Sequence, residues 1–352
     1  MYDIIIVGLG PSGSVLASAL DKRFSVLCID RKKESGGFMK PCGGLLAPDA
    51  QKALASLGLN LPKNVLVDPQ IFSVRTIDMD NNLIKSYQRM YINLNRHRFD
   101  MWLISEIPDY IDRDEGVVTD ISKMEKGYLV GYTVNGERKT AECKYLIGAD
   151  GAKSIVRRFI KPDLKTRSYM SIQQWFREEN PVPFYSCIFD SNITDCYSWT
   201  VSKDGYFIFG GAYPRKDSRM LFERQKESLM KLGMKFGEPI KTEACLVLRP
   251  TGLNSFFSGK DGIFLTGEAG GFISPSSLEG ISSAVISGIT LAEILNSGVK
   301  NPQKAYKKAV ASLKLKLSAK VFKCPFMYSP SLRKLVMKSG VMTIHVKDDK
   351  KF

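Results

Sequence analysis

The stretch DIIIVGLGPSG, residues 3–13, decides the fold. Its apolar half predicts a buried strand, and its glycine-rich half predicts a tight turn that opens a helix. In such a turn Gly8 lets the chain reverse sharply, Gly10 lets the backbone approach a pyrophosphate, and Gly13 lets helix and strand pack closely. The helix then begins with free amides and a positive dipole end, which suit phosphate groups. The other candidate binding positions of this fingerprint are Pro11 and Ser12.

An acidic residue follows at the spacing that dinucleotide binding requires. The segment FSVLCID predicts a second strand that ends at Asp30, 22 residues after Gly8. A carboxylate there can accept hydrogen bonds from ribose hydroxyl groups, and it would repel a 2′-phosphate, which argues against NADP in this pocket. We therefore expect the turn, Asp30 and the adjacent Arg31 to bind a dinucleotide. The alternative is a tight turn with a purely structural role.

Length and composition indicate a globular chain of about two domains. It has 352 residues, of which 44% are hydrophobic and 25% are charged. No run of about 18 uncharged apolar residues is present, so no membrane-spanning helix is expected, and the first predicted strand leaves no room for a signal peptide. Seven widely spaced cysteines without a CxxC pair argue against a disulfide framework or a zinc site. We expect a cytoplasmic protein.

The positive charge is concentrated at the end of the chain. The formal net charge is +15, and residues 300–352 contain 14 Lys or Arg against Asp348 and Asp349, which gives +12. Within them, KKAVASLKLKLSAKVF mixes apolar residues and lysines at helical spacing. One interpretation is a solvated helix that covers the core. The other is a face that contacts anionic lipid, on the inner face of the membrane, or an acidic partner. No nucleic-acid recognition motif accompanies this charge.

The order of predicted elements indicates an α/β fold with a discontinuous nucleotide domain. Segments that alternate strands and helices occur at both ends of the chain, and a β-rich block lies between them. We expect a Rossmann-like domain with an inserted, mostly antiparallel β-sheet substrate domain and a helical C-terminal tail. The expected bounds are 1–70, 93–165 and 255–298 for the nucleotide domain, 71–92 and 166–254 for the substrate domain, and 299–352 for the basic tail.

Two later motifs resemble those of a known superfamily. YLIGADGAKSIVRR, residues 145–158, has Asp150 directly after a predicted strand. GIFLTGEAGGFISPSSLEGISSA, residues 262–284, has Glu268 after a strand and a helix opened at Gly280. Together with the first fingerprint and the helix that begins with RHRFD, they resemble the flavoprotein monooxygenase-like superfamily typified by para-hydroxybenzoate hydroxylase. The resemblance implies that the dinucleotide is FAD.

Two further stretches point to one branch of that superfamily. KPCGGLL, residues 40–46, and YSWTVSKDGYFIFGG, residues 197–211, resemble the cysteine–glycine and Tyr-x-Trp motifs of the geranylgeranyl reductase family. The chain departs from that pattern in three places. Leu45 stands where the family usually has a third glycine, residues 201–203 read Val-Ser-Lys where it usually has Phe-Pro-Lys, and Glu268 stands where it usually has Asp.

The resemblance implies cofactor contacts along most of these motifs. The glycine fingerprint and Asp30 would hold the ADP half of FAD, and Glu268 would contact the ribityl–pyrophosphate region. Arg96 would reach toward the pyrophosphate, and the backbone of Val118 would meet the adenine. The remaining implied contacts are Arg31, Asp150 and, at the pyrimidine edge of the isoalloxazine ring, the amides of Gly280 and Ile281.

The same resemblance implies that the loop with Cys42, Gly43 and Gly44 runs beside the flavin ring. The glycines would let the backbone pass close to the ring. Cys42 would shape the cavity or assist protonation of the substrate carbon, and the alternative is an inert buried thiol. Aromatic residues of the β-rich block are candidates for the substrate pocket, with packing in a core as the alternative: Trp175, Phe184, Tyr197, Trp199, Phe207 and Phe209.

The expected chemistry belongs to the cofactor, because no Ser/His/Asp triad or metal-ligand cluster is present. The resemblance implies an FAD-dependent oxidoreductase that reduces carbon–carbon double bonds of an apolar, prenyl- or lipid-like substrate by hydride transfer from reduced flavin. The alternatives are a flavin-dependent monooxygenase of aromatic or polycyclic substrates and a non-catalytic flavin-binding partner protein. The electron donor would be NAD(P)H, bound transiently because no second glycine fingerprint is present, or ferredoxin.

Overall fold

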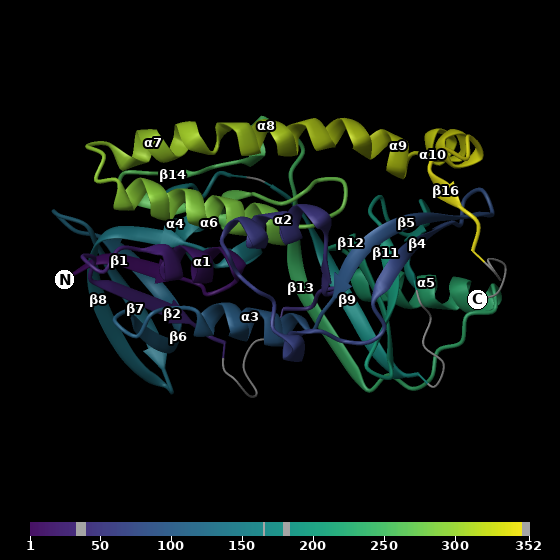
Figure 1. The fold of residues 1–352 in the computed structure, drawn as a ribbon, viewed down its shortest axis with the longest axis horizontal. Helices are drawn as coiled ribbons and strands as arrows, with labels where there is room; N and C mark the ends of the chain where they lie inside the picture. The colour runs from purple at the N-terminus through teal and green to yellow at the C-terminus, as the bar shows by residue number, and fades with distance from the viewer. Residues whose placement is uncertain (33–39, 165, 179–183, 347–352) are drawn as a thin grey trace.

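The computed structural model describes residues 1–32, 40–164, 166–178 and 184–346. Two sheets lie side by side along the long axis of the molecule, and helices from the last part of the chain run across both (Figure 1). The predicted fold class is confirmed: a parallel-stranded nucleotide-binding type of sheet, a second and mostly antiparallel sheet, and a helical C-terminal region.

The first sheet is built around the strand predicted from DIIIV. Its members are β1 (Tyr2–Val7), β2 (Val26–Asp30), β6 (Asp112–Lys123), β7 (Tyr128–Val134), β8 (Glu137–Gly148), β14 (Gly259–Lys260) and β15 (Ile263–Leu265). β1 pairs in parallel with both β2 and β8, and β15 pairs in parallel with β8. Most residues of β1, β2 and β15 and the end of β8 are buried, which explains why these stretches are continuous apolar runs rather than alternating ones.

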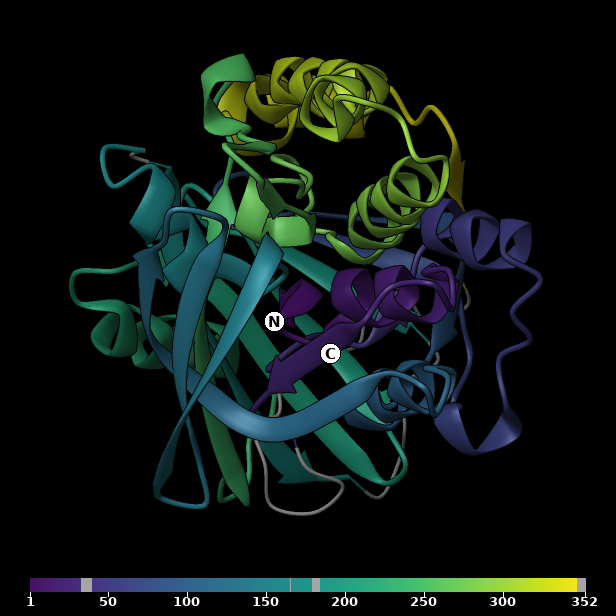
Figure 2. The ribbon, with the colours of Figure 1, turned by 90° about the vertical axis from the view of Figure 1, so that its left-hand side faces the viewer.

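Helices pack around the first sheet (Figure 2). They are α1 (Pro11–Ala19), α2 (Pro48–Ser56), α3 (Arg96–Ser105), α4 (Ile155–Ile160) and α6 (Ile281–Asn296). α1 and α6 pack directly on each other. A Cβ atom at Gly288 of α6 would lie 2.4 Å from the Ser12 carbonyl oxygen, so only glycine permits this contact. The side chain of Asn95 starts α3 by accepting hydrogen bonds from two backbone amides of its first turn.

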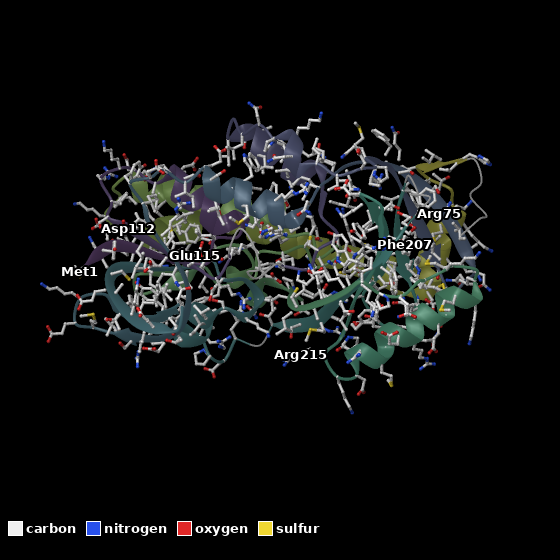
Figure 3. The ribbon with its side chains drawn as sticks, turned by 90° about the horizontal axis from the view of Figure 1, so that it is seen from below. Met1, Arg75, Asp112, Glu115, Phe207 and Arg215 are labelled. Atoms are coloured by element: carbon white, nitrogen blue, oxygen red, sulfur yellow. The ribbon has the colours of Figure 1, made fainter. Side chains whose placement is uncertain are left out.

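The second sheet forms the other end of the molecule. Its strands are β3 (Leu45–Leu46), β4 (Ile71–Asp78), β5 (Leu83–Asn93), β9 (Arg167–Arg177), β10 (Phe184–Phe189), β11 (Ser198–Lys203), β12 (Tyr206–Pro214), β13 (Lys241–Arg249) and β16 (Thr343–Ile344). All pairings are antiparallel except that of β4 with β10. Arg75 and Phe207 mark this end, and Met1, Asp112 and Glu115 mark the other (Figure 3). Helix α5 (Ser218–Lys231) packs on one face of the second sheet.

Two short edge strands cross the domain bounds expected from the sequence. β3 pairs with β5 although it belongs to the segment assigned to the nucleotide domain. β16 also pairs with β5, from within the segment assigned to the tail. Strands of two residues carry no readable periodicity, so these pairings are visible only once the chain is folded.

The C-terminal region is a run of helices that joins the two sheets. It consists of α7 (Pro302–Ala309), α8 (Ala311–Ala319), η5 (Lys320–Lys323), α9 (Cys324–Tyr328) and α10 (Pro330–Lys338). Tyr306, Leu313 and Leu317 are buried in the core above the first sheet. Arg333 of α10 is 4% exposed and forms ion pairs with Asp78 at 2.7 Å and Asp80 at 2.5 Å, which anchors α10 on the second sheet. Among the described residues, no helix combines the length and the apolar character needed to cross a membrane.

Short one-turn elements complete the description. They are η1 (Lys63–Val65), η2 (Gly151–Lys153), η3 (Leu253–Ser255) and η4 (Gly267–Gly270). η2 and η4 lie just after β8 and β15, which are neighbouring parallel strands. The carboxyl ends of parallel strands are where ligands bind in open α/β sheets. Both predicted motifs with an acid after a strand therefore converge at one edge of the first sheet.

Candidate functional site

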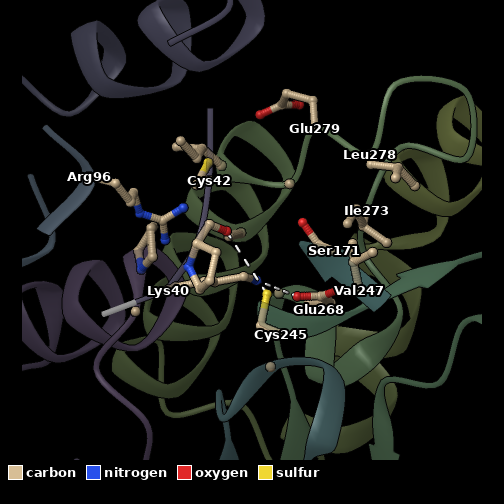
Figure 4. Close-up of a pocket in the computed structure, with 18 of the residues that line it drawn as sticks. Lys40, Cys42, Arg96, Ser171, Cys245, Val247, Glu268, Ile273, Leu278 and Glu279 are labelled. Atoms are coloured by element: carbon tan, nitrogen blue, oxygen red, sulfur yellow. Dashed lines mark hydrogen bonds and ion pairs between the residues drawn. The ribbon is translucent and has the colours of Figure 1, made fainter. Parts of the chain in front are cut away.

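A cavity of about 930 Å³ lies where the carboxyl edge of the first sheet meets the second sheet. Figure 4 shows around it side chains from the second sheet, from segments that follow strands of the first sheet, and from the loop before β3. Most of the predicted site residues line this cavity: Gly8, Gly10, Pro11, Ser12, Asp30, Arg31, Cys42, Gly43, Gly44, Arg96, Val118, Asp150, Tyr197, Trp199, Glu268, Gly280 and Ile281.

Gly13 is the one glycine of the fingerprint that does not line the cavity. A Cβ atom there would lie 1.9 Å from the Gly8 carbonyl oxygen, so this glycine serves the packing of the turn. Gly8 has φ +97°, and a Cβ atom on it would lie 2.7 Å from the Ala149 carbonyl oxygen. Gly10 differs from both, because a Cβ atom there would meet nothing within 4 Å. Gly10 therefore faces open space at the start of α1, as close approach of a phosphate requires.

Asp30 is held by the turn that it helps to shape. Its Oδ2 accepts a hydrogen bond from the Leu9 amide at 2.5 Å, and its Oδ1 accepts one from the Lys32 amide at 2.6 Å. The ammonium group of Lys32 lies 3.5 Å from Asp30 and 3.8 Å from Asp100. The carboxylate thus has a structural role in addition to the predicted one of accepting from ribose.

Arg96 links the nucleotide end of the cavity to the Cys42 loop. Its Nε lies 2.9 Å from Asp100 Oδ1 one turn further along α3. Burial disfavours the charge of Arg96, but Asp100 and the Cys42 thiol outweigh this effect and raise its pKa. The thiol is within hydrogen-bonding reach of the guanidinium. Cys42 therefore has a permanent positive charge beside it, although Arg96 is far away in the sequence.

Lys40 forms an ion pair that the sequence did not reveal. Its Nζ lies 2.5 Å from Glu268 Oε2 (Figure 4), and Glu268 Oε1 accepts a hydrogen bond from the Leu248 amide at 2.8 Å. Burial disfavours the charge of Lys40, but Glu268 outweighs burial and raises its pKa. A bare carboxylate at this edge of the sheet would repel a pyrophosphate, and the paired Lys40 neutralises it.

Lys203 anchors the Cys42 loop from the second sheet. Its Nζ donates hydrogen bonds to the Gly44 carbonyl at 3.1 Å, to Asn93 Oδ1 at 2.5 Å and to the Leu94 carbonyl at 2.7 Å. Gly44 has φ +60°, and a Cβ atom on it would lie 2.5 Å from the Leu94 carbonyl oxygen, so this glycine is required. Burial lowers the pKa of Lys203 to about 7, although the Cys42 and Asp204 side chains oppose this effect.

The wall next to this loop is aromatic. A Cβ atom at Gly43 would lie 3.7 Å from Trp199 Nε1 and 4.0 Å from the Tyr185 ring, so both aromatic side chains lie against this loop. The Tyr197 and Trp199 rings are 5.9 Å apart, and the Tyr197 hydroxyl donates a hydrogen bond to the Ser277 carbonyl at 2.6 Å. Tyr185 and the thiols of Cys187 and Cys245 also line the cavity, and none of these three was singled out from the sequence.

The prediction that Phe207 and Phe209 line the pocket is wrong. Trp199 pairs with Gly210 across β11 and β12, whereas Phe209 pairs with Thr200, so Phe209 faces the opposite side of the sheet. Phe209 packs there on Phe222 of α5 at 5.1 Å between ring centroids, and Phe207 joins the same core. Trp175 and Phe184 do not line the cavity either. A sequence shows that successive strand residues alternate, but not which face meets the cavity.

Three buried polar atoms of the cavity have no hydrogen-bond partner among the described residues. They are Ser12 Oγ, Asp150 Oδ1 and Trp199 Nε1. Burial raises the pKa of Asp150, whose other carboxylate oxygen accepts from the Ile155 amide at 2.7 Å. Unpaired buried polar groups are costly unless a ligand satisfies them. These atoms, the open start of α1 and the cations along the cavity fit FAD, whose phosphates and ring carry many hydrogen-bonding groups.

The start of α6, where free backbone amides were expected, is capped in part by the side chain of Glu279. Its carboxylate accepts hydrogen bonds from the Ser282 amide at 2.8 Å and from the Ser282 hydroxyl at 2.6 Å. Gly280 and Ile281 line the cavity as predicted, and Glu279 lines it beside them. In the part of the chain that the structure describes, no group of three or more histidine, cysteine, aspartate or glutamate side chains is arranged to hold a metal ion.

Comparison with known proteins defines the class. Residues 116–244 match the FAD binding domain family. A geranylgeranyl bacteriochlorophyll reductase-like protein from Thermoplasma acidophilum has the same fold, with a TM-score of 0.77 at 19% identity over 99% of this chain and 94% of that chain. A flavin-dependent brominase, Bmp2, has a TM-score of 0.66 at 19% identity over 96% of this chain and 92% of its own. Residues 116–244 thus match an FAD binding domain, and the whole chain has the fold of these flavin-dependent enzymes.

Within that class, one group of relatives matches almost the whole chain. Protein CbrA of Escherichia coli O6:H1 is 49% identical over 349 residues, which cover 97% of this chain and 94% of that protein. Protein CbrA of Shigella sonnei is also 49% identical, over 97% of this chain and 98% of its own. The chain belongs to the CbrA family.

Proposed function

We propose that this protein reduces a carbon–carbon double bond of an apolar, prenyl- or lipid-like substrate. The observation that carries the proposal is the make-up of the cavity beside the Cys42 loop. Its wall there is aromatic and aliphatic: Tyr185, Tyr197, Trp199, Val247, Ile273 and Leu278. Such a chamber suits a hydrocarbon chain, and the one unpaired donor in it, Trp199 Nε1, can orient a polar group of the substrate.

The chain's own residues divide into cofactor and substrate groups. Gly10, Ser12 and the start of α1 would hold the pyrophosphate of FAD, and Asp30 would hold its ribose. FAD, when bound and reduced, supplies a hydride to an electron-poor or polarisable double bond. The aromatic and aliphatic side chains around Trp199 would limit the access of water to the reacting bond.

Cys42 would supply the proton that completes the reduction. Adding a hydride to one alkene carbon leaves the other carbon to be protonated, and the Cys42 thiol would donate this proton within the cavity. The thiolate that remains would be stabilised by the neighbouring Arg96 guanidinium, which also lies within reach of Asp100. Solvent would later return the proton, since Cys42 and Gly43 are only partly buried.

A second candidate, a flavin-dependent monooxygenase, is favoured by one observation. The chamber contains an edge-to-face pair of Tyr91 and Tyr185 at 6.3 Å, next to the Tyr197 and Trp199 pair. Aromatic walls of this kind also suit a planar aromatic substrate.

The two candidates differ in what they do with oxygen. The protein would be reduced without oxygen and mixed with geranylgeraniol in detergent micelles, with an aromatic acid such as 4-hydroxybenzoate as a comparison. We expect geranylgeraniol to reoxidise the flavin without oxygen and to gain two hydrogens at one of its double bonds. In a parallel reaction, isotopically labelled O₂ would be admitted to the reduced protein with each substrate. Incorporation of the label into either product would contradict the reductase proposal and favour the monooxygenase.

A further inference from the structure

The outer side of the C-terminal helices exposes large apolar side chains. Helical backbone continues from α8 through η5 into α9. Leu313 and Leu317 of α8 are buried, whereas Leu315 between them is 65% exposed and faces away from the core. Phe322 and Phe326 follow Leu315 by two and three helical turns and are 80% and 53% exposed. Leu315, Phe322 and Phe326 thus form an outward stripe, here called the apolar stripe.

Basic side chains surround the apolar stripe, and acidic ones are absent from this part of the sequence. Residues 300–346 contain no Asp or Glu. Arg333, Lys316 and Lys320 are paired with aspartates of other elements. Seven further lysines are exposed and form no ion pair in the described part of the chain: Lys300, Lys304, Lys307, Lys308, Lys323, Lys334 and Lys338. Exposed aromatic and leucine side chains beside lysines are typical of helices that lie in a membrane interface.

We propose that the apolar stripe and its lysines dock the protein on the surface of an anionic lipid bilayer. An acidic protein partner would also match the charge. Three large side chains projecting from a single helical run favour the bilayer, because they can enter the acyl region while the lysines contact lipid phosphates. Leu335 and Val336 of α10 are also exposed apolar side chains of this C-terminal region.

The same helical run borders the mouth of the cavity. Lys320, Lys323 and Met327 line the cavity, one or two turns from each other on η5 and α9. Lys320 lies 3.6 Å from Asp49 of α2, which holds this run against the first domain at the rim. Docking through Phe322 and Phe326 would therefore place the helical run that borders the cavity against the bilayer. Docking on a bilayer does not depend on which reaction the protein catalyses. The use of docking to deliver an apolar substrate rests on the proposed function.

Co-sedimentation of the full-length holoenzyme with vesicles tests the docking. The vesicles would be phosphatidylcholine alone or phosphatidylcholine with phosphatidylglycerol, at low and at high salt. We expect binding to the anionic vesicles that weakens as salt screens the lysines. Phe322→Ser with Phe326→Ser should lower the vesicle affinity at least about tenfold, because two buried aromatic contacts are lost. Met220→Ser, at a 59% exposed position on α5, is the matched control and should leave binding unchanged.

Bound FAD and tryptophan quenching show whether a change in vesicle binding reflects the docking surface itself. Bound FAD, measured by absorbance, should be unchanged in all variants, which separates loss of docking from loss of fold or of the flavin site. The tryptophan fluorescence of the Phe322→Trp variant should be quenched by phosphatidylcholine brominated in its acyl chains when anionic lipid is present. Absence of binding to both kinds of vesicle overturns the proposal, as does binding that the two Phe substitutions leave unchanged. Binding to immobilised polyglutamate but to neither vesicle would assign the surface to an acidic protein instead.

Discussion

The ammonium group of Lys203 donates a hydrogen bond to the Gly44 carbonyl oxygen across 3.1 Å, so a strand of the second sheet holds the loop that carries Cys42. Lys203 is 4% exposed and also binds oxygens of Asn93 and Leu94. One buried side chain thus joins its own strand to the Cys42 loop and to the Asn93–Leu94 segment, beside the cavity. The position of Cys42 relative to the flavin site depends on this contact.

Lys203→Met should change how stability depends on pH. Burial lowers the folded-state pKa of Lys203 to about 7 from the usual 10.5, so the unfolded chain binds more protons between these values. The free energy of unfolding of the wild type should therefore rise with pH across this window, relative to the variant, by up to about 1.4 kcal/mol per pH unit. Below about pH 7 the difference between the two should be constant. Urea unfolding at several pH values measures this, and parallel curves throughout would contradict a titrating Lys203.

Gly10→Ala should separate cofactor binding from folding. A Cβ atom at Gly10 meets nothing in the protein, so the thermal stability of the cofactor-free chain should change by less than about 0.5 kcal/mol. The same methyl group would stand where a phosphate approaches, so FAD affinity in a fluorescence titration should fall. Gly8→Ala is the matched comparison: its φ of +97° and its 2.7 Å approach to Ala149 should destabilise the fold itself. If Gly10→Ala binds FAD as tightly as the wild type, the pyrophosphate does not lie at this turn.

Asp30→Ala should weaken FAD retention by about tenfold to a hundredfold, because one hydrogen bond to a charged acceptor is worth about 1.5–3 kcal/mol. The variant should also lose stability without FAD, since the Leu9 and Lys32 amides lose their acceptor. Asp30→Asn keeps an acceptor oxygen and should recover much of the folding stability. Equilibrium titration and thermal unfolding report the two effects separately, and unchanged FAD affinity in Asp30→Ala would remove this residue from the site.

Cys42→Ala should slow product formation without loss of FAD. Proton transfer by a positioned group contributes about 10²- to 10⁴-fold to a rate, and the anaerobic reoxidation of reduced flavin by substrate should slow by that order. Cys245→Ala is a suitable control, because this thiol lines the same cavity and burial raises its pKa to about 11, which keeps it protonated and unreactive. Equal rates in wild type and Cys42→Ala would leave Cys42 as a packing residue.

The local features of this chain could be predicted because they depend on neighbours in sequence. The strand, the glycine turn and Asp30 lie within one short segment, and the acids at positions 150 and 268 each follow a strand directly. Their convergence follows from parallel strands sharing a carboxyl edge. The general rules of strand and helix pattern therefore sufficed for the nucleotide half of the cavity.

The substrate half depended on contacts between distant segments, which no local pattern carries. Phe207 and Phe209 have the same alternation as the residues that line the cavity, and only the pairing of β11 with β12 shows that they face α5. Lys203 and Arg96 reach the Cys42 loop from other elements. The burial of Lys203 within β11 is visible only in the fold, because a lysine beside Asp204-Gly205 indicates an exposed turn. Lys40 gave no signal in the sequence either.

The cavity is closed by residues from opposite ends of the chain. Gly8 contributes the turn near the start, and Met327 borders the same cavity near the end. During synthesis the glycine turn leaves the ribosome well before the helical run that carries Met327. A nascent chain can therefore form the strand and helix around this turn early, but its flavin chamber stays incomplete until that helical run has been made. Cofactor capture in this architecture consequently follows synthesis of the helical run, and a chain that stops before it would leave the chamber open to solvent.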